Sequence, residues 1–373
     1  MYLITNRALN PEKKGLDVFA KTPNPAGPNE LRLMRVNKKN DGWMARAIID
    51  KLTPATVKAL KKRYNLDLDI SRPWHGSLKV ACELFDQARR QNKSILFFIH
   101  GYNNDVEDVI DTADEIEKLY GVIVVPFTWP ANGGGAISGT ASYLSDKGDA
   151  RVSSGALNRT IGKIQQLHLM LTTARKNQLL ERAMKKHPDN RQAAQSHFVR
   201  LVEKDCPVTL NLLCHSMGNY VFKSTLKTSD NATSGLVFDN ICLVAADVNN
   251  ASHAQWVGKL DARKRIYVVI NENDSALRVA RIKPGDEQLA RLGHYTRKLN
   301  SPNVHYIDVT EARQVGTEHS YFRGDAIGNE SLKFMFNEMF NGRAVEHHLK
   351  YWPDNNSYKL ESTGIENINQ DHA

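Results

Sequence analysis

The chain has 373 residues, a length that suits one large α/β domain with additions or two domains. Its hydrophobic fraction of 41% and charged fraction of 24% are ordinary for a globular protein. No run of eighteen apolar residues exists, so we expect no transmembrane helix. Residues 1–7 lack the charged start and long apolar stretch of a secretory signal, so none is expected.

The net charge of +9 raises the question of binding to nucleic acid or to an anionic membrane. The cations are spread along the chain apart from two short clusters, at residues 58–63 and 185–186. No DNA- or RNA-binding motif accompanies them, which favours a moderately basic enzyme surface. The basic N-terminal segment keeps nucleic-acid binding open as an alternative.

Four cysteines are few for this length, and no pair has the spacing of zinc ligands. The sequence therefore predicts no cysteine-based metal site. It predicts buried free thiols in a reducing cytoplasm. The four are Cys82, Cys206, Cys214 and Cys242.

Residues 1–75 differ in pattern from the rest of the chain. Residues 31–36 largely alternate apolar and basic side chains, as in a half-buried strand, after a loop marked by proline and glycine. Thr53 and Pro54 then suit the N-cap and first position of a short helix. We expect this N-terminal extension to form either extra strands of the main sheet or a small basic appendage.

From residue 76 onward, apolar strands alternate with helices. Residues 94–99 form a nearly continuous apolar run, as in a strand that is buried on both faces. An amphipathic helix at 106–119 and a strand at 122–127 follow. Later strands are expected at 208–214, 241–246, 265–270 and 304–309, with a last helix at 331–340.

This alternation predicts the α/β class, with a doubly wound, mostly parallel sheet over residues 76–345. Residues 346–373 are expected to be a polar C-terminal tail. In such sheets ligands bind beyond the C-terminal ends of the strands, which is where we look for chemistry.

Residues 131–205 are a helical insertion between two core strands. In hydrolases, insertions near strand ends often form caps or lids over the site. Its apolar residues could line an acyl pocket or pack on the sheet. Tyr143 and Asp146 could reach the mouth of the site, but the sequence assigns them no role. The apolar residues are Ile161, Ile164, Leu167, Leu169, Met170 and Leu171.

The segment 214–218 lies between a predicted strand and a predicted helix. A sharp turn there would place Ser216 at its apex, with Cys214 and Gly218 as the small residues that prevent collision. The dipole of the following helix favours negative charge at Ser216. The segment resembles the G-x-S-x-G nucleophile elbow of the α/β-hydrolase superfamily, with Cys214 in place of the first glycine.

The segment 100–104 ends an earlier strand of the same sheet. It resembles the HG-type loop of esterases and lipases in this superfamily. The resemblance implies that the backbone N–H groups of Tyr102 and Met217 form an oxyanion hole, each supplying roughly 3 kcal/mol of transition-state stabilisation. Gly101 would let the backbone approach the substrate closely.

The order nucleophile, acid, histidine in this superfamily implies the remaining catalytic residues. Asp274 follows the strand at 265–270 and is the expected acid, while Asp247, which follows the preceding strand, is the alternative. His319 lies after the last strand and before the last helix, so it is the expected general base for Ser216.

Residues 94–340 thus resemble an uncharacterised bacterial, esterase- or lipase-like branch of the superfamily. The matching stretches are residues 100–104, 127–130, 215–219, 272–277 and 319–322. The resemblance implies a serine hydrolase that cleaves a small-molecule carboxylic ester through an acyl-enzyme, without metal or cofactor. Alternatives are an acyltransferase or thioesterase using the same triad, and a non-catalytic binding module. The motifs specify neither acyl chain length nor oligomeric state.

Overall fold

The computed structural model describes residues 1–365 except 41, 132–138, 206–207, 229–235 and 282–289, and only the backbone of 139–142 and 227–228. Eleven strands of this part of the chain form one sheet, in the order β12-β13-β11-β10-β9-β8-β6-β7-β1-β4-β5. Their bounds are β1 (Tyr2–Thr5), β4 (Arg32–Lys39), β5 (Gly42–Ala47), β6 (Ile95–Ile99), β7 (Ile123–Thr128), β8 (Leu210–His215), β9 (Asn240–Val244), β10 (Arg265–Ile270), β11 (His305–Asp308), β12 (Lys350–Trp352) and β13 (Ser357–Lys359). A separate hairpin pairs β2 (Arg7–Leu9) with β3 (Phe19–Pro23).

The eight neighbouring strands β13-β11-β10-β9-β8-β6-β7-β1 are all parallel, which confirms the α/β class with a mostly parallel sheet. The apolar runs are continuous because both faces of the sheet are covered. Successive side chains of β6 show this, since Phe97 packs into the core on one face and Phe98 into the core on the other.

Ten α-helices and four short 3₁₀ helices lie in the described residues. On one face, α3 and α10 cover the sheet, and on the other face α5, α7 and α8 do. The helices are α1 (Pro54–Tyr64), α2 (Gly76–Gln91), α3 (Val106–Tyr120), α4 (Gly139–Val152), α5 (Ser154–Lys186), α6 (Arg191–Lys204), α7 (Gly218–Thr228), α8 (Ala254–Val257), α9 (Ser275–Ala280), α10 (Glu330–Phe340), η1 (Leu292–His294), η2 (Gly324–Gly328), η3 (Glu346–His348) and η4 (Pro353–Asn355).

The N-terminal residues extend the main sheet. β1 pairs in parallel with β7 and antiparallel with β4, and β5 forms the edge. The alternation in β4 arises because Met34 and Val36 are buried while Arg35 is exposed. Thr53 caps α1, and its hydroxyl accepts a hydrogen bond from the Thr56 amide.

The expectation of a polar tail from residue 346 onward needs correction, because part of that segment is folded onto the sheet. Residues 350–359 form β12 and β13, and β13 pairs in parallel with β11. Two apolar side chains beyond them, Leu360 and Ile365, are buried against the α10 face. Each strand has only three residues, too few to show a periodic pattern in the sequence.

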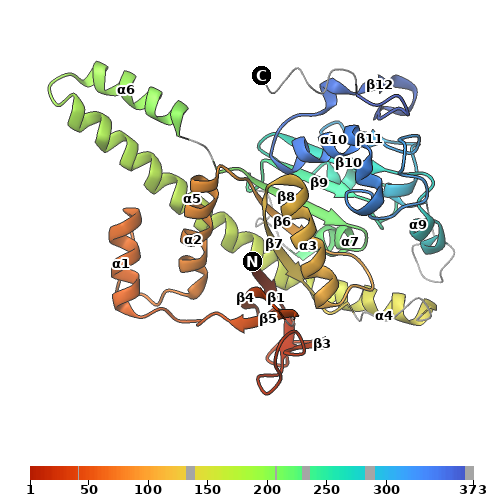
Figure 1. Cartoon of the computed structure of the whole chain (residues 1–373), viewed down its shortest axis with the longest axis horizontal. Coiled ribbons are helices and arrows are strands. Elements are labelled where there is room, and N and C mark those ends of the chain that lie inside the picture. The colour runs from red at the N-terminus through yellow and green to blue at the C-terminus, as the bar shows by residue number, and fades with distance from the viewer. Residues whose placement is uncertain (41, 132–138, 206–207, 229–235, 282–289, 366–373) are drawn as a thin grey trace.

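The insertion forms α4, α5 and α6. Figure 1 shows α5 as a long diagonal helix that runs past the sheet, with α6 packed alongside it. The first turns of α5 pack on the sheet, where Ile161 is buried, whereas Leu169 further along is 65% exposed. Among the described residues no helix, including the 33-residue α5, is both long and apolar enough to cross a membrane.

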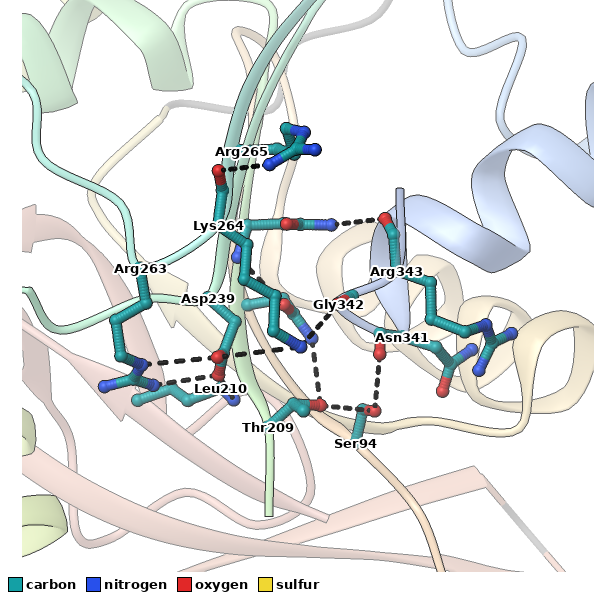
Figure 2. Close-up of polar contacts among 12 residues, drawn as sticks. Ser94, Thr209, Leu210, Asp239, Arg263, Lys264, Arg265, Asn341, Gly342 and Arg343 are labelled. Carbon is teal, nitrogen blue, oxygen red and sulfur yellow. Dashed lines mark hydrogen bonds and ion pairs between the residues drawn. The ribbon is translucent and has the colours of Figure 1, made fainter. Parts of the chain in front are cut away.

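A polar network joins the N-terminal ends of the strands to the end of α10 (Figure 2). Asp239 accepts hydrogen bonds from the Arg263 guanidinium at 2.8 Å and from the Leu210 amide at 2.9 Å. Lys264 Nζ donates to the Gly342 carbonyl at 2.8 Å. The network lies at the strand ends opposite those where catalysis is expected, so we assign it to stability.

Three of the cysteines, Cys82, Cys214 and Cys242, are buried free thiols. Cys206 lies outside the described residues.

Candidate active site

Ser216 occupies the turn between β8 and α7, at the point where the strand order reverses. The chain proceeds from β6 to β7 on one side and returns to β8 on the other side of β6. Ser216 has φ = +53°, a left-handed conformation that L-residues avoid and that costs of order 1–3 kcal/mol. Its amide donates to the Val244 carbonyl at 3.1 Å, and Asn219 Nδ2 donates to the Cys214 and Ser216 carbonyls. The tight turn is therefore held from within.

Two glycines make this turn sterically feasible. A Cβ on Gly218 would lie 2.4 Å from the Ile99 carbonyl oxygen, so only glycine lets α7 start this close to β6. A Cβ on Gly101 would lie 2.7 Å from Ser216 Cβ and 3.1 Å from Ser216 Oγ. Cys214, which replaces the glycine of the family motif, is buried within β8, paired with Ile99 and Leu243 in the neighbouring strands.

The expected acid and base lie in contact. His319 Nδ1 is 2.6 Å from Asp274 Oδ2. Asp274 is fully buried and caps α9, and its other oxygen, Oδ1, accepts from the Leu277 amide at 2.9 Å. Both carboxylate oxygens are thus engaged, which fixes the direction from which Asp274 contacts the imidazole.

Asp247, the alternative acid, is held in a different contact. Its carboxylate forms an ion pair with the buried Arg291 at 3.0 Å and accepts from the Tyr143 hydroxyl at 3.0 Å. The Arg291 side chain is 2% exposed, so this pair is almost entirely removed from water. The structure therefore brings Asp274, and not Asp247, to His319.

The loop that carries His319 is anchored by its neighbours. His215 Nε2 is 3.2 Å from the His319 carbonyl oxygen, and burial holds the pKa of His215 well below its usual value. A neutral His215 donates its Nε2 proton to that carbonyl. The Tyr321 hydroxyl donates to the Val269 carbonyl and accepts from the Ala245 amide, which ties the loop to β9 and β10.

The loop with the expected oxyanion donors packs against α4. The Asn103 amide donates to Asp146 Oδ2 at 3.3 Å, and the Tyr102 and Tyr143 rings meet edge to face with centroids 5.6 Å apart. In the described part of the chain, the Met217 amide donates no hydrogen bond to a backbone carbonyl. That amide is thus placed at the start of α7, where the helix dipole favours an anion.

His100 fixes the start of the same loop. Its Nε2 accepts from the Trp129 amide at 3.2 Å, and its Nδ1 donates to the Gly101 carbonyl at 2.9 Å. Burial lowers the pKa of His100 to about 3, so the imidazole is neutral at pH 7. His100 is a structural residue that holds Gly101 in place.

Ser216 and His319 line one small cavity, of about 80 Å³. Gly101 and Tyr102, from the loop with the expected oxyanion donors, line this cavity. Arg323 also lines it and forms an ion pair with Glu115 at 3.0 Å. No described residue of the insertion lines this cavity. The insertion reaches the site through α4, which supports the oxyanion loop.

Two residues that position the site, Asn219 and Tyr321, were given no role from the sequence, and Asp146 was named without one. Asn219 donates to backbone carbonyls inside its own turn, whereas Asp146 and Tyr321 bond to backbone atoms far away in the chain, so no local pattern marks their roles. In the described part of the chain, no group of three or more metal-ligating side chains comes together.

Comparison with known proteins gives one family. The family model described as "Alpha/beta hydrolase of unknown function (DUF900)" matches residues 80–173 and 163–326, about two thirds of the chain. These ranges include all the candidate site residues. No solved structure shows a significant match.

Some curated proteins share a short stretch with the chain, and two of them are release factors. These two are Peptide chain release factor 3 of Nitrosomonas eutropha, 38% identical over 60 residues, and Peptide chain release factor 3 of Nitrosomonas europaea, 36% identical over 60 residues. The stretch covers 16% of this chain and 11% of each release factor. A similarity of this extent carries no functional argument here.

Proposed function

The chain belongs to the family of α/β-hydrolases of unknown function (DUF900), and from that premise we propose that it is a serine esterase. The observation that carries the proposal is the shared cavity. It is lined by a serine in a left-handed turn and by a histidine whose other ring nitrogen contacts a buried carboxylate.

In the proposed reaction, Ser216 Oγ attacks the carbonyl carbon of an ester while His319 Nε2 takes its proton. Asp274 keeps Nδ1 protonated and stabilises the imidazolium. The amides of Tyr102 and Met217 hold the oxyanion. His319 then gives the proton to the departing alcohol, and water, activated by the same imidazole, releases the acid from Ser216.

The size of the cavity favours a short acyl group. At about 80 Å³ it lies well below the range of about 300–1,000 Å³ that is typical of sites for larger ligands. We therefore propose acetyl and propionyl esters as substrates, ahead of medium-chain esters. The free thiols described above favour the cytoplasm as the compartment.

Turnover of p-nitrophenyl acetate and p-nitrophenyl octanoate by the full chain tests the proposal. We expect the acetate to be preferred, and Ser216→Ala and His319→Ala each to lower kcat by at least about 10³-fold. Ser320→Ala is a matched control, because Ser320 lines the same cavity but does not sit in the elbow. Undiminished turnover by Ser216→Ala would overturn the proposal.

The acyltransferase and thioesterase alternatives use the same acyl-enzyme. Product analysis with added alcohols and thiols separates them, because a transferase gives the exchanged ester as the main product. A chain that turns over no ester or thioester but keeps its fold would instead support the binding module.

A further inference from the structure

A second and much larger cavity, of about 600 Å³, lies away from Ser216. Its volume falls within the range of about 300–1,000 Å³ typical of small-molecule sites. The N-terminal segment, α2, α5 and the first residues of the central strands enclose it, including Ile95 of β6 and Leu210 of β8. Figure 1 shows α2 and α5 on the same side of the sheet.

The two cavities lie on opposite faces of the sheet. Phe97 lines the large cavity, and Phe98, the next residue in β6, lines the cavity at Ser216. Successive side chains of a strand point to opposite faces. The large cavity also borders the N-terminal ends of the strands, whereas Ser216 follows the C-terminal end of β8. It is therefore not the acyl pocket of the catalytic serine.

Two helices supply walls of the large cavity, and the α5 wall combines apolar side chains with Thr160, Lys163 and His168. Residues 160, 163, 164, 167, 168 and 171 of α5 line it, with the spacing of one helical face. Residues 77, 80, 81, 84 and 85 of α2 form the opposite wall with the same spacing. Phe85 of α2 packs with Leu167 and Leu171 of α5 in one hydrophobic cluster, and the remaining residues of both stripes border the open volume.

A lysine occupies one position of the α5 stripe. Lys163 lines the cavity and is partly buried, and its ammonium group donates at 3.0 Å to Oε1 of the exposed Gln166, so it lies where the cavity meets the solvent. No described carboxylate lies within ion-pair distance of it, and burial lowers the pKa of its ammonium group. His168, one turn further, has a buried Nε2 with no hydrogen-bond partner in the described part of the chain.

Each of the other charged side chains at the cavity contacts a partner, with Arg32 and Arg159 sharing the single carboxylate of Glu30. Arg32 and Arg159 both contact Glu30, at 3.7 Å and 3.5 Å, and Asp50 contacts His75 at 3.2 Å. Lys163 is therefore the described cation at this cavity whose charge lacks a carboxylate partner. An apolar volume with one such ammonium group is complementary to a single alkyl chain with one negative charge.

We propose that this cavity binds a free fatty acid, with the alkyl chain between α2 and α5 and the carboxylate on Lys163. Residues 30–33, 48–50 and 75–77 of the wall lie outside the matched family ranges. The site thus depends partly on the N-terminal extension of this chain. It is independent of the proposed esterase reaction.

Displacement of 11-(dansylamino)undecanoic acid from the full chain by octanoate, decanoate and dodecanoate tests the proposal. We expect one site per chain and an affinity that rises about fourfold with each added methylene until the cavity is full. Lys163→Met keeps the apolar stem and removes the charge, so it should weaken dodecanoate binding at least tenfold while leaving 1-dodecanol binding unchanged. Lys176→Met, an exposed lysine of α5 away from the cavity, is the matched control.

Two further measurements separate this site from the catalytic one and from surface binding. Ser216→Ala should bind dodecanoate as tightly as the unmodified chain, and Ala81→Trp, which fills the cavity, should abolish binding. Equal dodecanoate affinity in Lys163→Met and Lys176→Met would overturn the proposal. Loss of dodecanoate binding in Ser216→Ala would also overturn it, as would many weak dodecanoate sites per chain. A chain that self-associates and binds no dodecanoate would overturn it as well.

Discussion

His319 Nδ1 lies 2.6 Å from Asp274 Oδ2, while Asp274 Oδ1 accepts from the Leu277 amide at the start of α9. The helix cap therefore fixes the carboxylate, and the carboxylate fixes the imidazole, so the orientation of the proposed base depends on a local backbone feature. By contrast, Asp247 is held by Arg291 and Tyr143.

This difference gives opposite expectations for two isosteric substitutions. Asp274→Asn should lower kcat by about 10⁴-fold, because the amide favours the wrong imidazole tautomer, with a smaller effect on stability. Asp247→Asn should lower the free energy of unfolding by about 3 kcal/mol, because it leaves the buried Arg291 charge uncompensated, with kcat per folded molecule retained. Ester turnover and urea denaturation of both variants measure the two effects. The reverse pattern would make Asp247 the acid.

Gly101→Ala should strongly lower the proposed ester turnover while the chain stays folded. The new Cβ would lie 2.7 Å from Ser216 Cβ, so the oxyanion loop must move, and a shift of about 1 Å costs about 10²-fold in rate. We expect kcat/KM for p-nitrophenyl acetate to fall by at least that factor. Gly162→Ala on α5 is the matched control, since its Cβ would meet no atom within 4 Å. Full activity in Gly101→Ala would show that this loop does not contact the reacting ester.

The left-handed backbone conformation of Ser216 should lower the stability of any variant that keeps a side chain at this position. Glycine adopts φ = +53° freely, whereas alanine in that region costs roughly 1–2 kcal/mol. Ser216→Gly should therefore be more stable to urea than Ser216→Ala by about 1 kcal/mol, after part of the gain is offset by the greater freedom of glycine in the unfolded chain. Equal stability of the two variants would argue against a strained elbow.

The buried neutral histidines predict how stability depends on pH. The folded pKa of His100 is about 3, below the value of about 6.5 in the unfolded chain, so protons bind the unfolded state first. The contribution of His100 to the free energy of unfolding is therefore fully present well above pH 6.5. Below that pH it falls, by up to about 1.4 kcal/mol per pH unit, as the pH decreases toward 3. His215, whose pKa is also lowered by burial, adds a loss of the same sign.

Urea denaturation between pH 7 and pH 5 measures this slope. In that window Asp and Glu side chains with lowered pKa values stay ionised in both states and contribute little. His100→Gln should reduce the average slope over this window by about 1 kcal/mol per pH unit, since the unfolded histidine is only partly protonated near pH 7, although it lowers stability at pH 7. An unchanged slope in this variant would mean that His100 is not a buried neutral group.

The sequence predicted the central strands because they leave strong local signals, while the order of the proposed triad came from the resemblance to the α/β-hydrolase superfamily. The runs at β6, β8 and β10 are continuously apolar, and Ser216, Asp274 and His319 each follow a strand. The choice between Asp274 and Asp247 stayed open, because each aspartate follows a strand and its partners come from distant parts of the chain. Arg291 and Tyr143, which hold Asp247, carry no motif of their own.

The edges of the sheet and the large cavity were harder to predict for a physical reason. β12 and β13 are too short to show periodicity, and their pairing depends on β11. Ile164, Leu167 and Leu171 were expected either to line an acyl pocket or to pack on the sheet. They line a cavity, but it lies on the face away from Ser216, and no sequence pattern reports which face of the sheet a helix covers.

Identification of the residue that reacts covalently with a fluorophosphonate tests the central claim most directly. Tandem mass spectrometry of the labelled full chain should place the adduct on Ser216, with labelling abolished in Ser216→Ala and strongly slowed in His319→Ala. An adduct on another residue of an ester-hydrolysing chain, or unchanged labelling in Ser216→Ala, would contradict the account.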